Sequence, residues 1–144
     1  MVHERRKDWD AARKTYEDLL KIDDGSLIGL NNLAYLLSDK LNQPRLALPY
    51  AERASVIHRL PVVRDTLAWT LVQLGEYRKA IAVLTRLLEE DPRYVPAMYH
   101  LGEAYRRMTL RCQAPGGIGQ TKGHPWDRHR TNSISREEIA RQSS

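Results

Sequence analysis

The sequence predicts an all-α protein built as a solenoid of antiparallel helix pairs, with about six helices. Apolar residues recur at helical spacing over most of the 144-residue chain. A pattern of apolar and small residues also returns at a constant interval of about 34 residues. Glycine and proline, such as Gly75 and Pro92, stand between the helical runs and mark their ends. Together these observations indicate stacked helical hairpins around one continuous core.

The repeat appears when three segments are aligned: NNLAYLL at 31–37, DTLAWTL at 65–71 and YHLGEAY at 99–105. Leu33, Leu67 and Leu101 are equally spaced at this interval, and a small residue follows each of them. A second series recurs at twice that distance. Its members are Trp9, Ala12, Tyr16, Leu19 and Leu20, which return as Tyr77, Ala80, Leu84, Leu87 and Leu88.

This spacing resembles the tetratricopeptide repeat family, whose unit reads W-x2-L-G-x2-Y…A-x3-F…P. The best unit of this chain fills the pattern with Arg64, Leu67, Ala68, Leu71, Ala80, Leu84 and Pro92. The resemblance covers about residues 8–108, and the sequence of these repeats is similar to that of bacterial members of the family. It implies a right-handed superhelix in which the first helix of each unit lines a concave groove.

The repeats predict helices that alternate between first and second members of each pair. We expect them at about 8–22, 27–38, 45–59, 62–74, 78–90 and 95–108. The solenoid then spans 1–108, as a half repeat (8–26), two repeats (27–60 and 61–94) and a second half repeat (95–108). The first full repeat has Ala47 and Ala51 displaced by one, so it needs one extra residue in its turn and one fewer after its second helix.

Small residues and breakers have a physical role in this pattern. Ala68 and Ala80 are predicted to face each other and set the distance between paired helices. Gly75 allows the left-handed backbone that ends a helix, and Pro92 prevents the second helix from continuing. These positions are structural, and catalysis does not require them.

Residues 109–144 differ from the repeats because they are rich in Gly, Pro, Ser, Thr and Arg. We expect this tail to be mostly disordered, with a short helix possible at about 134–142. A native tail, a truncation, a fusion or a frame shift would each produce such a change of composition.

Composition limits the function. The charge of +5 is spread along the chain without a basic run, so no nucleic-acid partner is expected. A single cysteine, Cys112, excludes an internal disulfide, and no apolar stretch is long enough for membrane insertion, so a cytoplasmic location is expected.

No cofactor or metal is expected either. The segment GGIGQTKG at 116–123 lacks the Gly-Lys-Ser/Thr ending of a phosphate-binding loop. Cys112, His124 and His129 lack the short paired spacing of zinc ligands. No group of residues forms a catalytic triad pattern, so the chain is predicted not to be an enzyme.

The candidate binding residues lie on the first helix of each unit, which the resemblance places on the groove. Aromatic side chains there supply rigid contact area of the kind found at binding hot spots. The alternative is that Trp69 and Tyr99 only pack between neighbouring first helices. The candidates are Asn31, Tyr35, Asp65, Trp69, Gln73, Tyr99, His100, Glu103 and Arg106, with Asn32, Thr66 and Arg107 in a wider set.

These residues predict an interaction module or scaffold that binds a peptide segment or a partner helix. They do not fit the subtype that grips a C-terminal carboxylate, because Asn31 and Asp65 stand where that clamp needs Lys and Asn. A regulatory segment of a larger enzyme and a nucleic-acid adaptor are the alternatives. The two half repeats leave apolar faces near Trp9 and Tyr105, which predicts self-association.

Overall fold

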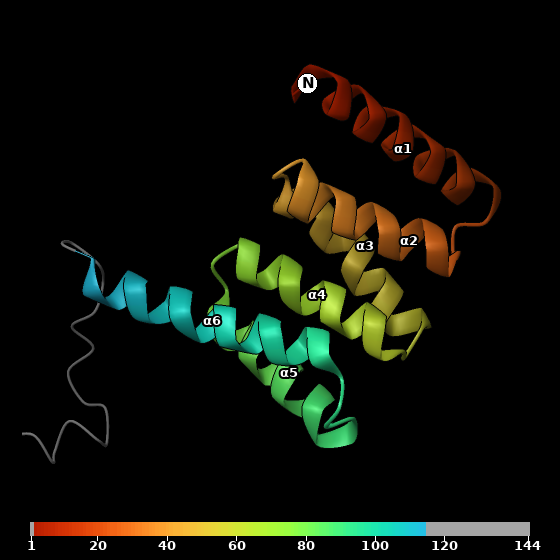
Figure 1. Cartoon of the computed structure of the whole chain (residues 1–144). Helices are drawn as coiled ribbons and strands as arrows, with labels where there is room; N and C mark the ends of the chain where they lie inside the picture. Colours follow the sequence, from red (N-terminus) through yellow and green to blue (C-terminus); the bar gives the residue numbers. More distant parts are fainter. Residues whose placement is uncertain (1, 115–144) are drawn as a thin grey trace, which may run out of the picture. The chain divides into compact units, whose positions relative to one another are not determined.

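A computed structural model describes residues 2–114, with side chains from residue 6 onward. All regular structure in this part of the chain is helical, which confirms the predicted all-α class (Figure 1). The elements are α1 (Val2–Ile22), α2 (Leu27–Tyr35), a π-helical segment η1 (Leu36–Lys40), α3 (Pro44–Ile57), α4 (Pro61–Gln73), α5 (Tyr77–Glu90) and α6 (Val95–Gln113).

Six α-helices were predicted, and the start of α1 and the end of α6 differ most from the prediction. α1 begins at Val2 instead of residue 8, because the charged residues ahead of Trp9 favour a helix. α6 continues to Gln113, five residues past the predicted end at Met108, because no glycine or proline follows Met108 until Pro115. Beyond residue 114, the predicted tail and its short helix lie outside the described residues.

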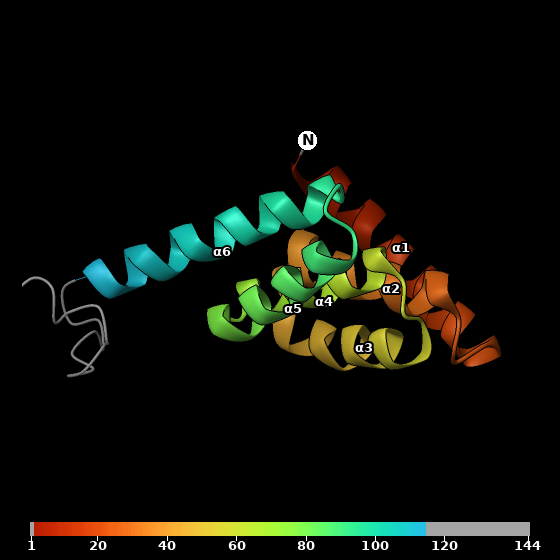
Figure 2. The same ribbon diagram turned by 90° about the horizontal axis from the view of Figure 1, so that it is seen from below.

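The three first helices begin in strict register. α2, α4 and α6 start at Leu27, Pro61 and Val95, each one repeat interval from the next. Ser26 caps α2 by accepting a hydrogen bond from the backbone N–H of Gly29, and proline occupies the first turn of α4. In Figure 1 these helices run in the same direction, and Figure 2 separates α3 from α2 and α4, which overlap it in the first view.

The predicted extra residue in the first turn appears as the π-helical segment η1. The backbone N–H of Leu41 bonds to the carbonyl of Leu36, a five-residue step that accommodates one inserted residue. Asn42 then takes a left-handed conformation (φ 51°), the role that Gly75 (φ 80°) has in the next repeat. The inserted residue is offset after α3. Only three residues (58–60) join α3 to α4, whereas four (91–94) join α5 to α6.

The core follows the repeats as a series of clusters. Leu30, Leu33 and Leu37 fill the first repeat, and Leu84 and Leu87 fill the second. The structure refines the predicted contact between the two alanines of the second repeat. Ala68 and Ala80 are both fully buried, but Ala68 packs with Leu84 and Leu87, whereas Ala80 packs in a neighbouring cluster.

The described helices were also compared with the requirements for crossing a bilayer. None of them combines the length and the apolar character that a membrane span needs.

Candidate functional site

The first helices α2, α4 and α6, with η1, bring most of the predicted binding residues together. Their side chains form one connected set of hydrogen bonds, ion pairs and ring contacts, which we call the cross-helix cluster. Its members are Tyr35, Asp39, Lys40, Asp65, Trp69, Gln73, Tyr99, His100, Glu103, Arg106 and Arg107.

Trp69 on α4 is the centre of the cluster and is only 7% exposed. Its indole Nε1 donates a hydrogen bond to the Asp39 carboxylate at 3.0 Å. The His100 ring stacks on it with the centroids 4.5 Å apart, and the Arg107 guanidinium lies 5.2 Å from its ring centre. Trp69 therefore ties η1, α4 and α6 together, and packing between neighbouring helices is what this side chain does in the structure.

The neighbouring pair is Asp65 and His100. Nδ1 of the histidine donates to the carboxylate at 2.7 Å, and both side chains are largely buried between α4 and α6. Tyr99 meets the same histidine edge-on, with the ring centroids 5.5 Å apart. The phenol of Tyr99 stays 66% exposed, so it faces solvent from a position fixed by the cluster.

Glu103 links the two arginines of α6. It accepts two hydrogen bonds from Arg106 (2.7 and 2.8 Å) and one from Arg107 (2.6 Å). Hydrogen bonds from Arg106 and Arg107 lower the pKa of this carboxyl to about 2. Arg107 also donates to Gln73 at 2.8 Å, which joins α6 to α4.

Asp39 and Lys40, which the sequence analysis missed, extend the cluster from η1. Burial favours a higher pKa for Asp39, but hydrogen bonds from Lys40 and Trp69 outweigh it, so the pKa is lowered. The Lys40 ammonium lies 5.8 Å from the ring centre of Tyr35, whose own pKa is raised by burial and then by nearby Asp39. The displaced register after the segment SDKLNQP (38–44) was the sequence signal for a longer turn, but it did not show which side chain the turn would direct at Trp69.

Asn31 is the predicted residue that stands apart. Its amide nitrogen approaches Asn32 at 3.5 Å, while its buried Oδ1 has no hydrogen-bond partner among the described residues. Thr66, from the wider set, is buried and bonds to the backbone carbonyl of Val62.

The charges of the cluster are matched within it. Each carboxylate already has a cationic or hydrogen-bonded partner, so the arrangement forms a rigid platform. Among the described residues no group of three or more His, Cys, Asp or Glu side chains is placed to hold a metal ion. His124, His129 and the GGIGQTKG segment lie outside the described residues.

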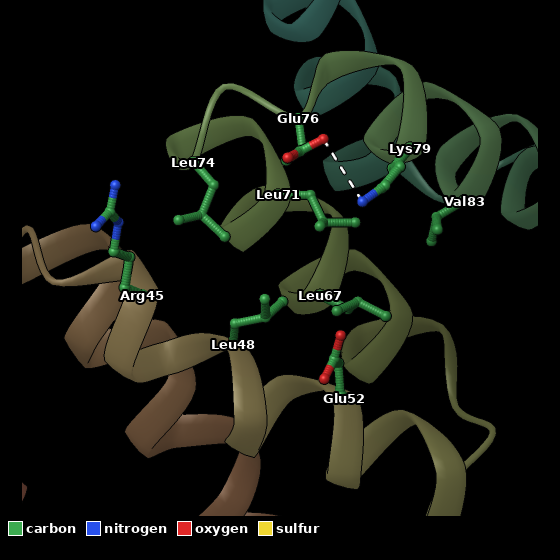
Figure 3. Close-up of a pocket in the computed structure, with 9 residues that line it drawn as sticks. All are labelled: Arg45, Leu48, Glu52, Leu67, Leu71, Leu74, Glu76, Lys79 and Val83. Atoms are coloured by element: carbon green, nitrogen blue, oxygen red, sulfur yellow. Dashed lines mark ion pairs between the residues drawn. The ribbon is translucent and has the colours of Figure 1, made fainter.

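A separate hollow of about 500 Å³ lies between α3, α4 and α5 (Figure 3). Its apolar wall includes Leu67 and Leu71 of α4 and Leu74 just after it, and Glu76 and Lys79 pair at its rim (3.6 Å). None of the predicted binding residues lines it. In this hollow the apolar side of α4, a first helix, lies between the second helices α3 and α5.

Comparison with known families matches residues 66–107, which cover most of α4, all of α5 and most of α6, to the tetratricopeptide repeat. Residues 66–107 of the chain therefore carry the tetratricopeptide repeat. Such repeats are protein–protein interaction modules in general, and the matched segment holds most of the cross-helix cluster. No curated protein matches the sequence.

Proposed function

We propose that the protein is a non-enzymatic scaffold that binds a peptide segment or partner helix on the face formed by α2, α4 and α6. The observation that carries this proposal is the cross-helix cluster, which fixes two exposed tyrosines on a rigid platform. Tyr35 is 41% exposed and Tyr99 is 66% exposed, one on each side of the buried Trp69. Aromatic rings held in place before binding lose little conformational entropy on contact, which favours affinity.

The chemistry of the cluster limits the ligand. Asp39, Asp65 and Glu103 already have partners, so a ligand does not gain by supplying several cations. Arg106 keeps a 60% exposed side chain beside Tyr99 and favours an acidic or polar group at one place. A segment with one or two apolar or aromatic side chains and mixed charge therefore fits best.

Selection from a displayed peptide library, followed by fluorescence anisotropy with the best peptide, tests this proposal. The variant Tyr35→Ala/Tyr99→Ala is expected to bind at least about tenfold more weakly, because two aromatic contacts are lost. Tyr105→Ala is the matched control, since it removes a 48% exposed tyrosine from another side of α6. Equal affinities of parent and double variant would contradict binding at this face.

A cytoplasmic location, a bacterial type and the absence of a nucleic-acid partner belong to this proposal. Salt titration with single-stranded and duplex DNA tests the last of these, since a steep loss of affinity with salt would indicate a phosphate-binding surface. Self-association through the ends of the repeat array is also proposed.

The alternative function is that of a regulatory segment within a larger enzyme. The mixed-charge face would then bind a segment of the same polypeptide. An antibody raised against the repeats distinguishes the two, because it would detect a polypeptide much larger than 16.6 kDa in the source cells.

A further inference from the structure

We propose that a second copy of this chain completes the unpaired repeat at α6. In this arrangement α1 of one copy packs on α6 of another as the second helix of that repeat. The inference specifies the proposed self-association and rests on it, and it is independent of peptide binding at the cross-helix cluster.

The first argument is an open position on α6. Gly102 occupies the repeat place held by Ala34 and Ala68, both of which are fully buried. A Cβ added at Gly102 would meet nothing within 4 Å among the described residues. The small residue that admits a second helix in the two full repeats is therefore present on α6 and uncovered.

The apolar side chains around this position repeat those of α4. Leu101, Tyr105 and Met108 stand one repeat interval after Leu67, Leu71 and Leu74, which Figure 3 shows between two second helices. Leu71 is 8% exposed, whereas Tyr105 is 48% exposed. This difference in exposure marks the side of α6 that has no second helix against it, whereas α5 covers the same side of α4.

α1 has the complementary open side, because it is a second helix without the first helix that would pair with it. It is a second helix by its sequence, because its pattern returns in α5. Ala80 and Leu87 of α5 are fully buried, but the equivalent Ala12 and Leu19 of α1 are only partly buried. The side of α1 that a first helix would cover is therefore also open.

The two surfaces match in chemistry at their edge. Between α4 and α5, Arg64 and Glu90 form an ion pair. Their equivalents at the proposed junction are Met98 and Ile22, which are 46% and 86% exposed. An ion pair within the chain is thus replaced by an apolar pair across the junction, and both members are left in water without it.

The lengths of the helices match as well. α6 runs six residues past Arg107, the equivalent of the last residue of α4. α1 begins seven residues before Trp9, the equivalent of the first residue of α5. In an antiparallel pair both extensions lie at the same end, where a junction between copies needs no connecting turn.

Such a contact joins unlike surfaces, so each copy keeps one free end for the next. It builds either a ring or an open chain of copies in place of a symmetric dimer. The mass in solution should therefore rise with concentration beyond that of the 16.6 kDa monomer.

Analytical ultracentrifugation of the full chain across a concentration series tests the proposal. Met98→Arg and Ile22→Glu are each expected to weaken association about tenfold or more, since each sets a charge against an apolar side chain. An equimolar mixture of the two variants should recover association, because it offers the Arg–Glu pair found between α4 and α5. Val56→Arg is the control, because it places the same charge at a 77% exposed apolar residue of α3.

Three results would overturn the proposal. A monomeric mass throughout the series would refute both self-association and this mode of it. Association that neither variant weakens would leave self-association standing and refute the junction, as would a mixture that does not recover. In the latter cases the face of α6 would belong to residues outside the described part of the chain or to another protein.

Discussion

The hydrogen bond between Trp69 and Asp39 gives the most direct test of the cross-helix cluster. Trp69→Phe keeps an aromatic ring against His100 but removes the Nε1 donor that Asp39 accepts at 3.0 Å. A hydrogen bond to a charged group contributes about 1.5–3 kcal/mol. The Asp39 side chain is 20% exposed and keeps Lys40, so water replaces part of the lost bond and the lower end applies. With the smaller ring, we expect the free energy of unfolding to fall by about 2 kcal/mol.

Urea unfolding followed by circular dichroism measures this change. A double-mutant cycle with Asp39→Ala isolates the bond, and a coupling energy of about 1–1.5 kcal/mol is expected. Trp9→Phe is the matched control, since Trp9 is partly exposed on α1 and has no role in the cluster. A coupling energy below about 0.3 kcal/mol, within the usual additivity of independent sites, would refute the view that the π-helical segment directs Asp39 onto Trp69.

Three further substitutions test other parts of the structure. Ala80→Leu should lower the free energy of unfolding by about 1–3 kcal/mol, because Ala80 is fully buried and a larger side chain overpacks its cluster; an unchanged melting temperature would contradict this. Gly75→Ala should cost about 1–2 kcal/mol in urea unfolding, because its φ of 80° is strained for a residue with a Cβ, and a neutral result would argue against a left-handed turn there. Because the pKa of Glu103 is lowered to about 2, its ionised carboxylate stabilises the fold above about pH 4.5, and this stabilisation is lost as pH falls toward 2. Glu103→Gln should therefore reduce the free energy of unfolding at pH 7 and flatten the acid side of the pH–stability curve. Parallel curves for parent and variant would show that Glu103 does not carry this dependence.

The repeat made most of the fold predictable. A constant repeat interval locates every first helix, since Leu27, Pro61 and Val95 begin α2, α4 and α6. The outer limits of α1 and α6 were not predictable in this way, because the repeat pattern describes only the residues that pack against a neighbour. At those ends helix propensity and the next breaker decide where the helix stops.

The candidate site was predictable in its members but not in their connections. Tyr99, His100 and Glu103 follow from their helix face alone. The pairing of His100 with Asp65, and the burial of Trp69, depend on how two helices well separated in sequence meet. Asp39 was missed because its direction depends on the π-helical segment, and the sequence indicated only that the turn was one residue longer.

The longer turn after α2 and the shorter link before α4 each shift the register of the repeat by one residue, in opposite directions. Between them α3 is displaced by one residue from the register of the array, and at Pro61 the register is restored. The change of length is therefore confined to a single hairpin, and the helices that follow keep the register of the repeat. Removing one residue from η1 alone would return the end of the first helix to ordinary α-helix and would shorten the interval between the starts of α2 and α4 by one residue. The repeat interval is therefore kept only if the turn before α3 and the link after it change in length together.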